Sequence, residues 1–265
     1  MSAPSSGSVF AALAASQVDQ AMRSLAQRRN RQGSIHAARK AIRRLRSILA
    51  LCRRALEPEV SVIDQKLKHL GDGLSDLRDA HVVATSALQL ATGDEREVWI
   101  AVASRLEARR EALLGAALAR DPEFAALRAQ LSMLAEAVAG LPWDRLGSMD
   151  LVKGLARSAR RLAKAERNAR QEPHAANSHL WRRRLRRLRM QYQVIRAVRK
   201  ASPSLLGLPQ ADPSTSIRTL TRLSDHLGRL QDLRMLRSSL KGMDTSLPLT
   251  QMRCRLRSEI NRASP

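Results

Sequence analysis

Histidine and arginine recur in two short segments at spacings that place them on one face of a helix. The first segment reads HAARKAIRRLR from His36, and the second reads HLWRRRLRRLR from His179. Because an α-helix turns by about 100° per residue, side chains at positions i, i+3, i+7 and i+10 form one narrow stripe. Arginine suits planar, bidentate contact with phosphoryl oxygens. We name as candidate phosphate-binding residues the first stripe (His36, Arg39, Arg43 and Arg46), the second stripe (His179, Arg182, Arg186 and Arg189) and the flanking Lys40 and Arg183.

The two segments are copies of one another. A shift of 143 residues places His36 on His179 and matches the arginines and the leucine that follow. A second pair of segments comes later in each copy, LSDLRDAHVV and LGRLQDLRML, and aligns Asp79 with Asp232. Because the order is the same in both copies, the repetition indicates duplication of a helical bundle.

A solvated basic face is the plainer interpretation of each stripe. Such a face predicts Lys and Arg mixed with Glu, and no second copy at the same phase. Like charges three or four residues apart destabilise a helix by roughly 0.2–0.5 kcal/mol per pair, so stability alone does not select these segments. The leading histidines can donate to phosphate, or they can cap and pack their helices.

Two acids and a further basic face complete the candidate groups. Asp79 and Asp232 can hold arginines in position, which we favour, or act as catalytic acids. A basic face in the second copy is a secondary candidate, formed by Arg157, Arg160, Arg161 and Lys164.

Helices must position these side chains, and the composition predicts an all-α fold. Hydrophobic residues make up 44% of the chain, mostly Ala and Leu, while aromatic residues make up only 2%. This mixture favours packed helices, and we expect almost no strand. Apolar residues from Ile63 to Leu77 keep a three-four spacing, which predicts one helix that buries one side.

Proline and glycine divide the chain into about nine helical segments. The expected boundaries are Gly33, Pro58, 91–95, Asp121 with Pro122, 140–148, Pro173, 203–213 and Pro248. We expect a single domain over residues 1–265, with an N-terminal half at about 8–142 and a C-terminal half at about 143–262. The loop at Pro142 would join the halves, because the charge changes there from acidic to basic.

The charge balance predicts a strongly anionic partner. The chain has 47 Lys and Arg against 24 Asp and Glu, a formal net charge of +23. Residues 21–56 hold eleven basic residues and no acid, and residues 151–211 hold sixteen against two. Between them, residues 57–150 hold ten basic residues and sixteen acids. The positive charge is therefore concentrated in two blocks, and it repels itself unless an anion neutralises part of it.

Cysteine usage and hydropathy predict a cytoplasmic protein. Cys52 and Cys254 have no neighbouring cysteine at metal-ligand or redox spacing and fit buried helical positions. The N-terminal residues lack a basic export signal, and no apolar run reaches the roughly 18 residues that span a bilayer. We expect no membrane insertion.

Motifs for catalysis are missing from the sequence. It contains no HExxH, no Walker glycine loop and no GxSxG, and its other histidines are scattered. We therefore expect no enzyme activity, no cofactor and no metal.

The two basic segments resemble the signature blocks of CHAD domains, the conserved histidine α-helical domains. The resemblance rests on IHAARKAIRRLR and SHLWRRRLRRLR, each followed by a helix ending near LRD or LQD, and it extends from about residue 10 to 262. It implies two four-helix bundles related by internal pseudo-twofold symmetry around a basic central channel. It also implies binding of inorganic polyphosphate, often at polyphosphate granules, with the two stripes lining the channel. Phosphate or sulfate would substitute for the ligand.

Two differences from the family pattern stand in this sequence. The second block continues with Met190 and Gln193, where relatives commonly have an aromatic residue and an acid. Many relatives also carry an N-terminal domain with an ExExK motif, whereas EREVW at 95–99 lacks the lysine. We therefore expect a stand-alone binder.

Two other functions compete with polyphosphate binding. A nucleic-acid-binding protein fits the net charge, but six scattered aromatic residues make a poor base-stacking platform. A polyphosphate-cleaving enzyme would depend on Mg²⁺ and on Asp79 or Asp232.

Overall fold

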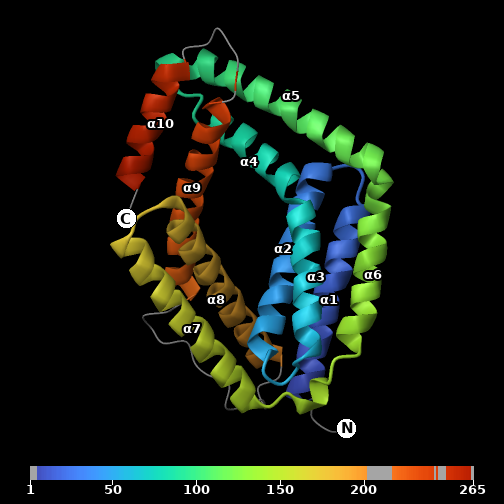
Figure 1. The fold of residues 1–265 in the computed structure, drawn as a ribbon. Helices are drawn as coiled ribbons and strands as arrows, with labels where there is room; N and C mark the ends of the chain where they lie inside the picture. Colours follow the sequence, from blue (N-terminus) through green and yellow to red (C-terminus); the bar gives the residue numbers. More distant parts are fainter. Residues whose placement is uncertain (1–4, 202–216, 242, 244–248, 264–265) are drawn as a thin grey trace. The chain divides into compact units, whose positions relative to one another are not determined.

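The structure confirms the all-helical prediction. This computed structural model describes residues 5–201, 217–241, 243 and 249–263. Within those ranges it contains α-helices, three short 3-10 turns and no strand. The α-helices, drawn in Figure 1, are α1 (Ser6–Ala26), α2 (Arg31–Cys52), α3 (Glu59–Gly73), α4 (Ser75–Gln89), α5 (Arg96–Arg120), α6 (Ala125–Ala139), α7 (Ser148–Gln171), α8 (Ala175–Ala201), α9 (Ile217–Lys241) and α10 (Leu249–Ala263).

Most of the expected boundaries fall where helices end. Pro58 precedes α3, residues 91–95 separate α4 from α5, and Pro173 separates α7 from α8. The boundaries expected at 203–213 and at Pro248 lie outside the described residues. None of the described helices is both long and apolar enough to cross a membrane.

The continuous helix expected from Ile63 to Leu77 is divided in two. Helix α3 ends at Gly73 and α4 begins at Ser75, with Leu74 outside helical geometry at φ −95° and ψ 5°. Glycine destabilises a helix interior, and two glycines, Gly71 and Gly73, stand at this point. The apolar spacing continues across the break, so the spacing alone predicted a longer helix.

The chain forms two compact units that alternate along the sequence. Unit 1 consists of Met1–Gly73 and Glu123–Ser224, and unit 2 consists of Leu74–Pro122 and Asp225–Pro265. Each unit takes segments from both sequence halves predicted above. The two halves describe the sequence repeat. Their division of the folded chain into two structural parts stays a prediction.

Unit 1 is built around α2. This helix contacts α1, α3, α7 and α8, while α1 also contacts α6. The two basic helices bury apolar residues on the side away from their stripes, with Ile42, Leu45 and Leu49 on α2 and Leu185 and Leu188 on α8. Their three-four spacing in the sequence places these residues on one side of each helix.

Helix α7 approaches α2 very closely at Gly154. A methyl group at this position would lie 2.1 Å from the carbonyl oxygen of Leu51, so a larger residue would force the helices apart. Arg157, Ser158 and Arg161 follow at i+3, i+4 and i+7 and share this face of α7. The glycine thus lets α7 bring two arginines to α2.

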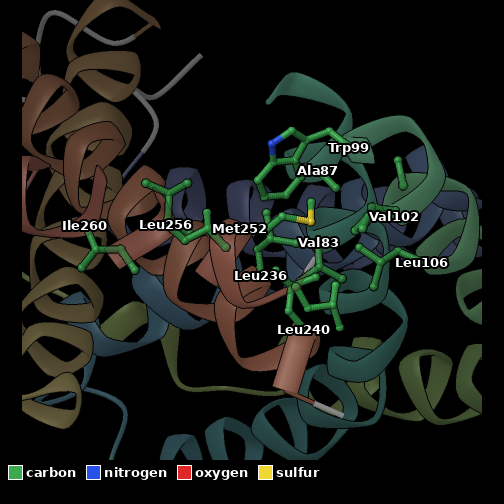
Figure 2. Close-up of a cluster of buried hydrophobic side chains, with 14 of the residues drawn as sticks. Val83, Ala87, Trp99, Val102, Leu106, Leu236, Leu240, Met252, Leu256 and Ile260 are labelled. Atoms are coloured by element: carbon green, nitrogen blue, oxygen red, sulfur yellow. The ribbon is translucent and has the colours of Figure 1, made fainter. Parts of the chain in front are cut away.

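Unit 2 has its own hydrophobic core. Figure 2 shows the cluster, to which α4, α5, α10 and the part of α9 after Asp225 contribute. Trp99, Val102 and Leu236 are fully buried in it. This core provides the packing for a separate compact unit.

Candidate anion-binding site

The helices that carry the two stripes pack directly against each other within unit 1. Buried Ser47 of α2 lies 3.6 Å (Oγ to Sδ) from Met190 of α8, and the Gln191 side-chain amide donates to the Ser47 carbonyl at 3.1 Å. Ser47 and Met190 are equivalent positions under the 143-residue shift. The structure therefore brings together two segments that the sequence identified separately.

Nearly all of the net charge belongs to unit 1. Its residues include 33 Lys and Arg against 12 acids, a net charge of +21. Unit 2 includes 14 Lys and Arg against 12 acids, a net charge of +2. Unit 1 therefore supplies most of the electrostatic attraction between this protein and an anion.

The first stripe is held partly by helix α3. Arg46 makes a bidentate ion pair with Asp64, with Nε to Oδ1 at 2.7 Å and Nη2 to Oδ2 at 3.1 Å. Arg39 donates to the carbonyl of Gly71 in the last turn of α3, where helix carbonyls lack partners within their own helix. These contacts fix the side-chain directions, and both arginines are half-buried.

The remaining stripe residues are accessible to different degrees. His36, Lys40, His179 and Arg183 are exposed. The arginines nearer the helix contact are half-buried: Arg43, Arg182, Arg186 and Arg189. Each stripe thus has an exposed histidine at its start and half-buried arginines along its length.

The histidines of the stripes do not cap their helices. Asn30 caps α2 through a hydrogen bond from the Gly33 amide at 2.9 Å. At the start of α8, Nδ1 of His174 accepts from the Asn177 amide at 3.4 Å. The capping alternative is therefore wrong for His36 and His179, which lie further along their helices.

Asp79 and Asp232 pair with the same arginine in unit 2. Nη1 of Arg78 lies 2.8 Å from Oδ1 of Asp79, and Nη2 lies 3.4 Å from Oδ1 of Asp232. Arg78 is not among the residues predicted from sequence, although its place directly before Asp79 was an available signal. The expected pairing of these acids with the stripe arginines stays a prediction, because the arginine that the structure places beside both of them is Arg78.

A second group of arginines surrounds a pocket in unit 1 that the sequence stripes do not include. Five of them line it, together with one acid: Arg53, Arg157, Arg161, Arg184, Arg187 and Asp64. On the helical wheel of α8, Arg184 and Arg187 lie about 180° and about 120° from the middle of the second stripe. Their spacing of three residues was the only sequence signal, and it is lost among the many arginines of α8.

Charges around this pocket are crowded. Burial lowers the pKa of Arg187 to about 10, with further lowering from Arg46 and Arg184, while Asp64 opposes the shift. Burial also lowers the pKa of Arg184, and Arg161 adds to the effect. Within the described ranges, no three His, Cys, Asp or Glu side chains gather closely enough to hold a metal ion.

Taken together, these features define an all-helical protein in which two copies of an arginine-rich helix meet. The family model of the CHAD domain matches residues 12–241. The chain therefore belongs to the CHAD domain family, as the two basic segments indicated.

A solved structure supports the same fold. The crystal structure of the CHAD domain from the plant Ricinus communis superposes with a TM-score of 0.65 at 19% sequence identity. The match covers 97% of this chain and 83% of that chain. No curated protein matches the chain.

Proposed function

We propose that this protein binds inorganic polyphosphate through the two stripes, without chemical conversion of the ligand. The observation that carries the proposal is the direct packing of α2 against α8 inside the unit with a net charge of +21. A flexible chain with about one charge per phosphate matches two rows of guanidinium groups. Each contact releases counterions, so affinity falls as salt rises.

We further propose that the two stripes line one basic channel between two four-helix bundles related by pseudo-twofold symmetry. Support comes from Ser47 and Met190, which occupy equivalent positions and touch each other. Contact between a position and its own counterpart is the pattern that a twofold axis produces. On this proposal the stripes present equivalent arginines to neighbouring parts of one ligand.

The aromatic residues favour polyphosphate over single-stranded nucleic acid. All six are buried, and the most exposed, Tyr192, has 8% of its surface accessible. Proteins that bind single strands stack bases on accessible aromatic rings. Polyphosphate has no bases and needs no such rings.

We also propose that the protein is cytoplasmic, associates with polyphosphate granules and is not an enzyme. Both Asp79 and Asp232 lie beside Arg78, which supports a role in holding that arginine rather than a role in hydrolysis. Incubation with polyphosphate and Mg²⁺ should release no orthophosphate. Release that depends on Asp79 or Asp232 would instead support the cleaving enzyme.

A competition titration tests the proposed ligand. Labelled long-chain polyphosphate is bound at physiological salt, and unlabelled polyphosphate, single-stranded DNA and duplex DNA are added at equal phosphate concentration. We expect polyphosphate to displace the label at concentrations at least tenfold lower than either nucleic acid. Better displacement by nucleic acid would make this a nucleic-acid-binding protein.

A further inference from the structure

The pocket arginines have no role in the function proposed above, and they differ from the stripes in arrangement. The stripes run along α2 and α8, whereas the pocket gathers arginines from the end of α2, from α7 and from α8 around one point. Arginines that converge on one point can bind a compact anion, whereas arginines in a row can bind successive charges of a chain.

Positive charge in the pocket is poorly balanced by the protein. Five guanidinium groups face one carboxylate, Asp64, and both oxygens of that carboxylate are already bonded to Arg46. Arg53 has its own partners, Glu57 and the Ser61 hydroxyl. In the part of the chain that the structure describes, no acceptor takes a hydrogen bond from Arg157, Arg161, Arg184 or Arg187.

Half-buried charges without partners are costly. Moving an ion out of water is unfavourable unless an opposite charge and hydrogen bonds compensate. Arg187 and Arg184 are half-buried, and burial together with neighbouring arginines lowers the pKa of both. A small anion with more than one negative charge would relieve this cost.

The chemistry of the lining points to a tetrahedral oxyanion. Guanidinium groups arrive from different helices, so they can bind separate oxygens of one group. Ser158 adds a hydroxyl donor from the same face of α7 as Arg157 and Arg161. A carboxylate has only two oxygens for these donors, whereas a phosphoryl group presents three or four.

We propose that this pocket is a separate site for one phosphoryl group, bound as free orthophosphate or as the terminal group of a phosphate chain. Binding of a chain end rests on the proposed function of polyphosphate binding, whereas binding of free orthophosphate does not. A terminal phosphoryl group carries more charge than an internal one, so the pocket would distinguish chain ends from chain interiors.

Calorimetric titration with three ligands separates the sources. Orthophosphate tests the free ion, linear tripolyphosphate presents two chain ends, and cyclic trimetaphosphate has none. We expect the wild-type protein to bind orthophosphate at one site, or to bind the linear chain at least tenfold more tightly than the ring. Absence of both results overturns the proposal.

The pocket variant Arg157→Gln/Arg161→Gln/Arg184→Gln assigns the site. We expect this variant to bind orthophosphate or linear tripolyphosphate, whichever the wild-type pocket binds, at least tenfold more weakly than the wild type does. The matched control Arg96→Gln/Arg109→Gln/Arg229→Gln removes the same charge from exposed positions of unit 2 and should bind as the wild type does. Equal losses in both variants would overturn the proposal.

Folding and the proposed function are checked separately. Circular dichroism and thermal unfolding without ligand show whether the triple variant is folded. Arg161→Gln alone changes an exposed position and should still lower the affinity for the bound phosphate ligand at least twofold. If the pocket variants bind phosphate normally while stripe variants lose long-chain polyphosphate, the pocket proposal fails and the proposed function stands. If stripe variants keep long-chain binding, the proposed function fails, whatever the pocket binds.

Discussion

The two compact units solve the same packing problem with very different charge. Unit 2 balances its arginines locally, for example Arg78 with Asp79 and Asp232, and Arg255 with Glu95. Unit 1 has a comparable core but a net charge of +21 against +2. Because unit 2 shows that helices of this chain pack without such an excess, the charge of unit 1 supports the proposal of an anionic ligand.

The largest effect should come from removing the centre of both stripes. Arg39→Ala/Arg43→Ala/Arg182→Ala/Arg186→Ala should weaken polyphosphate binding at least ten-thousandfold at physiological salt, since each of the four lost hydrogen bonds between charged groups is worth ~1.5–3 kcal/mol. Fluorescence titration measures the Kd, and circular dichroism checks helicity. Tight binding by this variant would exclude the stripes as the site.

The matched variant in unit 2 removes four exposed arginines, Arg96→Ala/Arg109→Ala/Arg229→Ala/Arg257→Ala. We expect less than a threefold change in Kd, because these positions lie outside the highly charged unit. A loss similar to that of the stripe variant would mean that total charge decides binding.

Two buried leucines compare the cores of the two units. Leu188 of α8 and Leu236 of α9 are both fully buried. Leu→Ala at either position should lower the free energy of unfolding by about 2–5 kcal/mol, as measured in urea. The folded Leu236→Ala protein should keep its polyphosphate affinity, whereas Leu188→Ala should lose several-fold, because its cavity lies beneath the arginines of α8. Equal effects on affinity would contradict this difference.

A smaller effect, in the opposite direction, is expected at Asp64. Asp64→Asn removes the negative charge beside Arg46 but keeps an oxygen that can accept its hydrogen bond. Because a nearby carboxylate repels phosphate by about 1 kcal/mol at contact distance in water, we expect roughly fivefold tighter binding. Asp79→Asn in unit 2 is the control and should leave the Kd unchanged. Weaker binding by Asp64→Asn would show that the acid mainly positions Arg46.

The smallest effect concerns the cysteines, one in each unit. Cys52 of α2 is buried, and burial raises the pKa of its thiol, while Cys254 of α10 is exposed. At pH 8 a thiol reagent should label one cysteine rapidly and the other only on unfolding. Cys254→Ser should remove the rapid phase without changing the Kd. Rapid labelling of both thiols would show that α2 is loosely packed.

Local features were predictable from the sequence because helical periodicity determines them. The buried leucines and the half-buried arginines of α2 and α8 alternate as helical spacing requires, for example Leu45 beside Arg46 and Leu188 beside Arg189. The break between α3 and α4 at Leu74 was not predictable, because the apolar spacing continues through it.

Partners from distant segments were not predictable. The contacts of Arg46 with Asp64 and of Arg78 with Asp232 depend on how helices pack, and many acids would satisfy the same pattern. The pocket around Arg187 depends on the close approach of α7 at Gly154. A repeat shows which segments are equivalent, but it does not show which segments pack into one unit.

The dependence of polyphosphate affinity on salt tests the central claim most directly, because its slope counts the phosphates that the protein neutralises. For a single strand the slope of log K against log salt is about 0.7 per neutralised phosphate. The stripe quadruple variant should therefore lose about 3 from the wild-type slope, and the unit 2 quadruple variant should keep it. Equal slopes for the two variants would contradict the assignment of polyphosphate to the stripes on α2 and α8.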